Sequence, residues 1–250
     1  MKLFERLKAS RDKIMEQPKG ERFSYFWDYY KWPAIIAVVL VITLIQTTIS
    51  IVNRKETVFT GYILNSTATT KDEEFLQGFF DYTGLDSSEV EAAIYSDMYL
   101  HPGQSQKNAE VFQRIMAGIA INDADFVVGL EEPFRMCAYN TSRIFVDLRK
   151  FLDAETLEKF SDRLYYIDGA LLEKLSAPVG ESVNTAGIIY PNPTKPELME
   201  DPIPVGLAVG DREALRASYY YHPDTVLYLG VITNTQRPEL TRQFIDYIFS

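Results

Sequence analysis

The sequence is poor in the residues that most often carry chemistry. Cysteine occurs once in 250 residues, as Cys137, and histidine occurs twice. A single cysteine excludes an intrachain disulfide, so the small secreted domains that are held by disulfides are excluded as a class. One thiol without neighbouring ligands also makes no structural zinc site. We interpret Cys137 as a small buried apolar residue.

Motifs of known catalytic and cofactor sites are absent as well. The sequence has no G-x-S-x-G, no H-E-x-x-H and no P-loop, and VGLAVGDREAL lacks the glycine spacing of a dinucleotide-binding turn. His101 and His222 each precede a proline, which favours extended or turn backbone, so we expect loop residues rather than metal ligands. Asp123 and Asp125 supply too few oxygens for a calcium loop, and we expect a helix-ending turn there. The sequence therefore predicts a protein that is not an enzyme and uses no metal or other cofactor.

Basic charge is scarce over most of the chain. Residues 1–55 hold ten Lys/Arg and five Asp/Glu, a balance of +5, whereas residues 56–250 hold fifteen and thirty, a balance of −15. The two balances give the −10 of the whole sequence. An acidic surface repels phosphate backbones, which excludes nucleic acid as a partner and favours cations or partners with basic patches.

One long apolar run is present near the N-terminus. Residues 33–52, PAIIAVVLVITLIQTTISIV, contain no charged side chain. A helix of about 20 residues spans the hydrocarbon core of a bilayer, and this run is longer than the apolar core of a cleavable signal peptide. The sequence predicts a transmembrane signal anchor over 33–52, with the lipid bilayer as its partner.

The segment before the run, residues 1–32, is basic and aromatic. Seven aromatic residues lie between Phe23 and Trp32, which is typical of an interfacial belt. Eight Lys/Arg in the first 31 residues favour a cytoplasmic N-terminus and an extracellular domain over 56–250, although the charges close to the two ends of the run are nearly balanced.

The outer region alternates between short apolar strands and amphipathic helices. We expect strands over 57–64, 90–95 and 125–130, with helices over 71–84 and 106–122 between them. A β-α-β-α-β order predicts a parallel sheet covered by helices, so the fold class is α/β. Later we expect strands over 143–148, 163–168, 185–191, 205–209 and 225–233, a helix over 154–161, a Pro-rich loop over 191–204 and a terminal helix over 237–250.

Two segments resemble a known family. DADFVVGLEEPFRMCAY…FVDLRKFL (123–152) and VLYLGVITNTQRPELTRQFIDYIFS (226–250) are similar to parts of extracellular solute-binding proteins. The short basic and aromatic leader with one helix resembles membrane-anchored relatives from Gram-positive bacteria. The resemblance implies a class II periplasmic-binding-protein-like domain. Its first lobe would use about 57–131 and 202–250, and 132–201 would form a reduced second lobe.

Candidate site residues lie where the expected parallel strands end. Ligands bind beyond the carboxyl ends of strands in open parallel sheets. Here those ends carry Asn65, Ser66, Asp97, Glu131 and Glu132, which suit a cationic or hydroxyl-rich ligand. The alternative is that the polar groups cap the next helix and that the acids are solvated. The three tyrosines of SYYYHP (218–223) suit either an exposed contact surface or a strand covered on both faces.

The sequence thus predicts a membrane-anchored extracellular binding module. Its ligand is either a small solute or a partner membrane protein. The alternative function is a protein-interaction module of an envelope or transporter assembly that has lost ligand binding.

Overall fold

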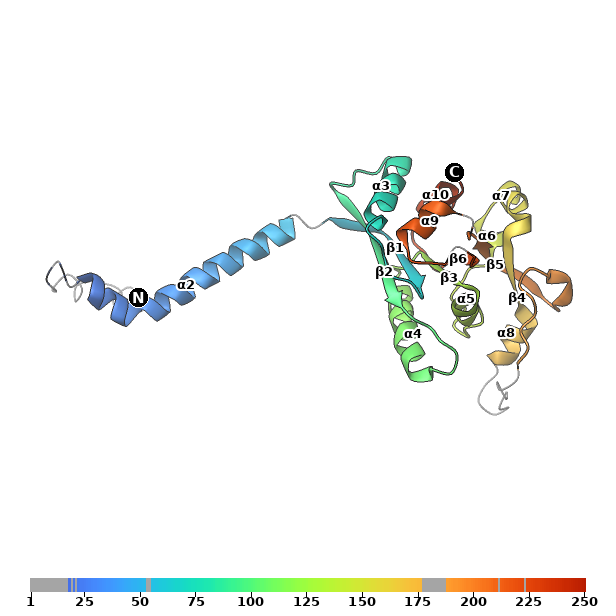
Figure 1. Ribbon diagram of the computed structural model, residues 1–250, viewed down its shortest axis with the longest axis horizontal. Helices are drawn as coiled ribbons and strands as arrows, with labels where there is room; N and C mark the ends of the chain where they lie inside the picture. The colour runs from blue at the N-terminus through green and yellow to red at the C-terminus, as the bar shows by residue number, and fades with distance from the viewer. Residues whose placement is uncertain are drawn as a thin grey trace. The chain divides into compact units, whose positions relative to one another are not determined.

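The structure is a computed structural model that describes residues 18, 20, 22–52, 55–176, 188–210, 212–222 and 224–250. The chain divides into two units, Met1–Arg54 and Lys55–Ser250. The described residues of the first unit lie almost entirely in one long helix, and those of the second are built on one sheet (Figure 1).

The helix of the first unit, α2 (Arg22–Val52), is longer than the predicted anchor. It takes in the aromatic segment from Phe23 to Trp32, and its stretch Lys31–Ile49 is long and apolar enough to cross a membrane. The apolar side chains from Ile35 to Ile49 are exposed. The hydroxyls of Thr43, Thr47 and Thr48 donate to carbonyls four residues earlier at 2.8–2.9 Å, so these polar groups are satisfied within the helix.

The second unit contains a mixed sheet of six strands in the order β2-β1-β3-β6-β5-β4. The strands are β1 (Glu56–Leu64), β2 (Val90–Met98), β3 (Phe126–Leu130), β4 (Leu164–Asp168), β5 (Pro202–Ala208) and β6 (Leu227–Val231). β1 lies parallel to both β2 and β3, as predicted, and β6, β5 and β4 add antiparallel pairs. The α/β class is confirmed. The sheet is mixed, with two parallel and three antiparallel strand pairs.

Helices cover both faces of the sheet. The chain moves outward from β1 to β2 and then back past β1 to β3, so two right-handed crossovers place their helices on opposite faces. The crossover helices are α3 (Asp72–Thr83) and α4 (Ser105–Ala120). The remaining helices are α5 (Glu131–Ala138), α6 (Leu148–Phe151), α7 (Ala154–Lys159), α8 (Gly169–Leu175), α9 (Glu213–Ser218) and α10 (Pro238–Phe249), with short 3-10 turns at Ser161–Arg163 and Pro196–Leu198.

Each face of the sheet has its own apolar core, because side chains alternate along a strand. Phe59 and Ile63 of β1 pack with α3, α6, α9 and α10, whereas Tyr62 and Leu64 pack with α4, α5 and α8. Figure 1 shows this division, with α3 and α10 on one side of the sheet and α4 and α8 on the other. Phe126 lies at the centre of the first core, with its ring 4.6 Å from that of Phe244 and 5.2 Å from that of Phe59.

Aspartate side chains begin three of the short helices. Asp147, Asp153 and Asp168 accept hydrogen bonds from backbone N–H groups of the first turns of α6, α7 and α8. Asp168 also accepts from the backbone of Glu200 and Asp201 at 3.2 and 3.1 Å. Burial raises its pKa, but these backbone donors outweigh burial and hold the pKa of Asp168 below its usual value. The cap therefore joins the end of β4 to the start of β5.

Two of the predicted strands were wrong. Within 143–148 only Phe145 bridges to Ile232, because Asp147 caps α6 and ends the extended backbone. The described part of 185–191, residues 188–191, is irregular, and Ile189 is 90% exposed. Residues 185–187 lie outside the described residues. The Pro-rich loop was predicted correctly, except that Pro202–Pro204 already belong to β5.

The segment 132–201 was expected to form a reduced second lobe. It contributes β4 to the same six-stranded sheet, and residues 55–250 form one compact unit. In the described residues there is no second sheet around which another lobe is built. A periplasmic-binding-protein-like domain is therefore not confirmed.

Close packing at Gly61 generates the first testable prediction. A Cβ on Gly61 would lie 2.1 Å from the Phe126 ring, which is buried and held by Phe59 and Phe244. Overpacking of this kind costs about 1–3 kcal/mol, so Gly61→Ala is expected to lower the free energy of unfolding by that amount. Urea denaturation of the full chain in detergent measures the loss. Gln106→Ala is the control, because Gln106 is exposed on the helix α4, and it should change stability by less than about 0.5 kcal/mol.

Candidate functional site

The polar residues predicted from the strand ends lie together at one edge of the sheet, where β1, β2 and β3 end side by side. Asn65, directly after β1, has a left-handed backbone with φ 55°. Its side-chain amide donates to the carbonyl of Leu100 at 2.9 Å and accepts from the N–H of Leu100 at 2.9 Å. The Asn65 amide therefore pairs with the backbone of Leu100 as a neighbouring strand would, and it fixes the loop after β2.

Ser66 and Asp97 are also part of this junction. Asp97 has φ 60°, and its N–H donates to the carbonyl of Ser66 at 2.8 Å. The hydroxyl of Thr67 donates to Asp97 Oδ1 at 2.7 Å and lies 3.0 Å from the Tyr99 hydroxyl. Ser66 is buried. Asn65, Ser66 and Asp97 thus meet as predicted, but their hydrogen bonds run to each other and to the backbone.

Glu131 and Glu132 follow β3 at the same edge of the sheet. They form the first turn of α5, where negative charge is favoured by the helix dipole. Each lies 3.5 Å from the guanidinium of Arg135, and both side chains are half exposed. Among the described residues, no hydrogen bond or ion pair connects them to Asn65, Ser66 or Asp97. The five residues thus lie at the ends of neighbouring strands, and none of them lines a cavity described for this structure.

Aromatic side chains that the sequence did not assign to this edge join it from elsewhere in the chain. The Tyr221 hydroxyl donates to the carbonyl of Leu64, and Tyr99 stacks against His101 with ring centroids 6.3 Å apart. Tyr219 is buried, whereas Tyr220 is 81% exposed. The tyrosines of 219–221 therefore do not form the strand that was one interpretation of their sequence.

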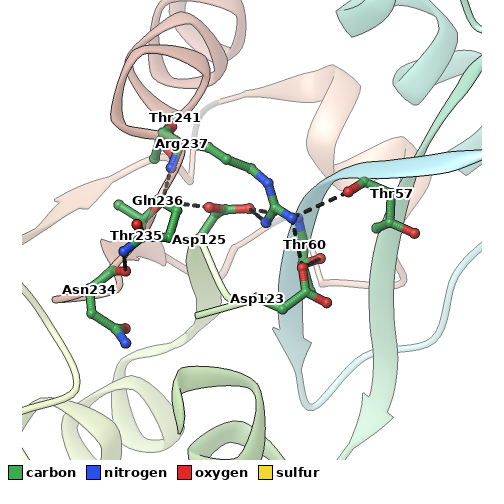
Figure 2. Close-up of polar contacts among 9 residues, drawn as sticks. All are labelled: Thr57, Thr60, Asp123, Asp125, Asn234, Thr235, Gln236, Arg237 and Thr241. Atoms are coloured by element: carbon green, nitrogen blue, oxygen red, sulfur yellow. Dashed lines mark hydrogen bonds and ion pairs between the residues drawn. The ribbon is translucent and has the colours of Figure 1, made fainter. Parts of the chain in front are cut away.

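A buried ionic network lies further back along β1 (Figure 2). The carboxylate of Asp125, which is fully buried, accepts from Thr60 N at 2.8 Å, from the Thr235 hydroxyl at 2.5 Å and from Arg237 Nη1 at 3.0 Å. Arg237 Nη2 donates to Asp123 at 2.7 Å and to the carbonyl of Thr57 at 3.2 Å. Burial lowers the pKa of Arg237, but the two carboxylates outweigh it and raise the pKa above its usual value.

The turn at Asp123 was predicted correctly, since its N–H closes α4 by donating to the carbonyl of Gly118 at 2.9 Å. The ionic role of Asp125 was missed. Its partner Arg237 is more than a hundred residues away in the sequence, and no motif connects the two. The network joins β1, the start of β3 and the loop before α10.

A cavity of about 220 Å3 adjoins this network on the α4 side of the sheet. Its lining includes Thr60, Tyr62, Tyr95, Arg114 and Asp123. The guanidinium carbon of Arg114 lies 4.7 Å from the centroid of the Tyr95 ring, and the rings of Tyr62 and Tyr95 stack at 5.6 Å. The cavity therefore combines aromatic walls with a cation.

A second concave region lies between α3, α9 and α10. Two neighbouring cavities of about 270 and 520 Å3 share Phe75, Glu213, Ala214 and Tyr247 in their lining. The Tyr247 hydroxyl donates to the carbonyl of Phe75 at 2.9 Å, so the wall of the groove is held by its own hydrogen bond. Lys71 and Glu74 add charges of both signs to its lining, which favours no ligand of one charge.

Cys137 is fully buried, and burial alone raises the pKa of its thiol to about 12. Its interpretation as a small buried residue is therefore confirmed. Both histidines lie in irregular segments, as predicted. Among the described residues, no group of three or more His, Cys, Asp or Glu side chains is placed to hold a metal ion.

Comparison with known proteins identifies no relative: no family model, no curated protein and no solved structure matches this chain. The resemblance to solute-binding proteins therefore stays a prediction.

The buried network generates the second prediction. Arg237→Met removes the guanidinium and leaves the Asp125 carboxylate buried without its ion pair, which typically costs about 3–5 kcal/mol. The free energy of unfolding should fall by that amount in urea denaturation monitored by circular dichroism. Lys174→Met is the matched control, because Lys174 pairs with Glu200 at 3.6 Å on the exposed surface, and such pairs contribute about 0–1 kcal/mol. Equal losses for the two variants would contradict the network's role.

Proposed function

We propose that this chain is a membrane-anchored, non-catalytic interaction module that binds an extended segment of a partner protein along β2. The observation that carries the proposal is the open edge of the sheet at β2. This strand is nine residues long, and its outer side pairs with no other strand of the described residues. Only Met98 of its residues is buried, whereas most residues of β1 and β3 are buried.

The opposite edge of the sheet is protected. β4 has five residues, and the loop at Pro193 lies against it, with the Tyr166 N–H donating to the Pro193 carbonyl at 2.8 Å. Proteins usually cover or interrupt an edge strand, because its free N–H and C=O groups pair readily with another chain. Covering at β4 and exposure at β2 therefore favour strand addition at β2.

The charge along β2 supports a basic partner. Glu89, Glu91 and Asp97 lie at or beside the edge strand, which contains no Lys, Arg or Pro. A second copy of this chain fits poorly, because antiparallel self-pairing in full overlap, centred on Ile94, places Glu91 opposite Asp97. Like charges directly opposite each other destabilise a strand pair. An extended segment with Lys or Arg residues is the occupant that this edge favours.

The solute-binding alternative has less support. Asn65, Ser66 and Asp97 direct their hydrogen bonds into the protein, and Glu131 and Glu132 flank Arg135. A solute that bound where β1, β2 and β3 end would have to displace those contacts. Ligand binding by these five residues stays a prediction. The similarity to class II periplasmic-binding-protein-like domains is a resemblance of two sequence segments, and the proposed function does not depend on it.

The membrane anchor is the other half of the proposed function. Lys31–Ile49 meets the length and composition of a span, and its threonine hydroxyls are satisfied within the helix. We place the N-terminus in the cytoplasm and the domain outside, on the basis of the eight Lys/Arg in residues 1–31. Digestion of the domain by protease added to intact cells supports this orientation, and its protection reverses it.

Charged substitutions in the span test the anchor. Arg at the centre of a span costs about 2.5–3.5 kcal/mol on insertion scales, so the double substitution Leu40→Arg and Leu44→Arg is expected to release the chain from the membrane pellet after carbonate washing. Leu198→Arg is the control, since Leu198 is exposed in the domain. Retention of the double variant in the washed pellet would count against a span at this position.

A basic extended peptide tests the β2 edge. We expect a nine-residue peptide of alternating valine and lysine to slow hydrogen exchange at residues 90–96 of the full chain in detergent, and its glutamate counterpart to have no effect. The Glu89 carbonyl accepts from Glu56 N and so points toward β1. Because backbone groups alternate in direction along a strand, the N–H and C=O of Ala92, three residues later, point away from β1. Ala92→Pro should therefore abolish the protection while β2 remains paired with β1.

The charge requirement has its own matched pair of variants. Glu91→Lys reverses a charge on β2 and should weaken binding of the lysine peptide, whereas the same change at Glu158 on α7 should leave it unaltered. Protection of α3, α9 and α10 instead of β2, or equal protection by both peptides, would contradict the proposed interface.

A further inference from the structure

The cavity between β1, β2 and α4 contains hydrogen-bond donors that the protein itself does not use. Arg114 projects from α4 over the ring of Tyr95, with the guanidinium carbon 4.7 Å from the ring centroid. Within the described part of the chain, Arg114 makes no hydrogen bond and no ion pair. A cation–π contact needs none of the guanidinium N–H groups as hydrogen-bond donors, and these groups form the fork that suits a carboxylate.

Tyr62 supplies a second unused donor. Its hydroxyl lies against α4 where Gly118 has no side chain, since a Cβ there would be 2.1 Å from the hydroxyl oxygen. Among the described residues the hydroxyl has no hydrogen-bond partner, and it belongs to the lining of the cavity. Burial raises the pKa of Tyr62 to about 12, with smaller contributions from Tyr95 and Asp123. The hydroxyl is therefore protonated at neutral pH and can donate.

The acid in the cavity wall does not neutralise Arg114. Among the described residues Asp123 pairs with Arg237 at 2.7 Å and not with Arg114, and because Arg237 also pairs with Asp125, the network of Figure 2 keeps one net negative charge. The remaining lining is mostly aromatic or apolar and consists of Thr60, Tyr62, Tyr95, Ala117, Gly118 and Ile121. The Arg114 cation and the Tyr62 hydroxyl thus belong to one partly apolar cavity.

We propose that this cavity binds a small organic carboxylate, with the carboxylate on Arg114 and Tyr62 and the apolar part against the tyrosine rings. A volume of about 220 Å3 is below that of pockets for drug-sized ligands. A single negative charge is favoured over a phosphate, because the domain as a whole is acidic. The same chemistry is offered by a free organic acid and by the glutamate side chain of a bound protein.

This inference does not depend on strand addition at β2. The cavity uses side chains on the α4 face of the sheet, whereas strand addition uses the outward backbone groups of β2. Loss of one property therefore leaves the other testable.

The experiment measures the melting temperature of the full chain in detergent against benzoate and benzamide at constant ionic strength. The two probes have the same shape and differ in charge. We expect a saturable rise in melting temperature with benzoate and none with benzamide, because a ligand that binds the native state stabilises it according to its concentration and Kd. Equal rises with the two probes would overturn the proposal.

Variants assign the binding to the named donors. Arg114→Gln should weaken benzoate binding about tenfold or more, because it removes a charge-assisted hydrogen-bond pair. Tyr62→Phe should weaken it less. Arg143→Gln, an exposed arginine 3.8 Å from Glu173, is the control with the same change in charge and should bind as the parent does. Unaltered benzoate binding in Arg114→Gln would contradict the assignment.

A conservative variant guards against loss of folding. If Arg114→Gln melts without cooperativity, Arg114→Lys keeps the charge but not the fork, and weaker benzoate binding by that variant supports the same conclusion. Unchanged benzoate binding by Arg114→Lys would contradict the claim that the paired N–H groups of the guanidinium bind the carboxylate. A glutamate residue capped at both ends is then compared with benzoate: tighter binding of the capped glutamate identifies a protein side chain as the source, and tighter binding of benzoate identifies a free acid.

Discussion

A carboxylate in the interior of a protein is stable only when other groups replace the water that it loses, and Asp125 meets this condition with three partners. A backbone N–H, a hydroxyl and a guanidinium converge on it from β1 and from the loop before α10. Because Thr60 lies on β1 and both Thr235 and Arg237 lie in the loop before α10, the ion pair forms only when β1, β3 and the C-terminal segment are assembled together. The same network holds Asp123, a residue of the wall of the cavity beside Arg114, against Arg237 at 2.7 Å.

The parts of the fold that depend on local patterns were predictable from the sequence. The apolar runs that became β1, β2 and β3 are separated by helices with clear apolar faces, and this order alone implies parallel strands. The pairing of β4 with β5 was not predictable, because it depends on which edge of the sheet stays free after β6 is in place. The segment 143–148 was predicted as a strand from its apolar run; in the structure the capped turn of α6 follows Phe145 too closely for more than one bridge.

The candidate site shows the same division. The rule for strand ends correctly grouped Asn65, Ser66 and Asp97, since parallel neighbours end at the same edge. It did not reveal that the Asn65 amide is used by the Leu100 backbone, because that contact depends on the left-handed turn after β1. Nor does a sequence show which groups remain unused. Arg114 and Tyr62 were not singled out, since a lone arginine on a helix and a tyrosine on a strand are each ordinary surface and core residues.

The connection of the anchor helix to the first strand has a mechanical consequence. The second unit begins at Lys55 and β1 begins at Glu56, so a pull on the N-terminal end of this unit reaches β1 before any other strand. β1 is flanked by parallel strands on both sides, and a force along its axis loads their hydrogen bonds in shear, all at once, rather than opening them one after another. A load applied at the neighbouring strand β2 would reach the tether through this same ladder. The strand at the centre of the parallel pairs is thus also the first element of the sheet to bear tension applied at the N-terminal end of this unit.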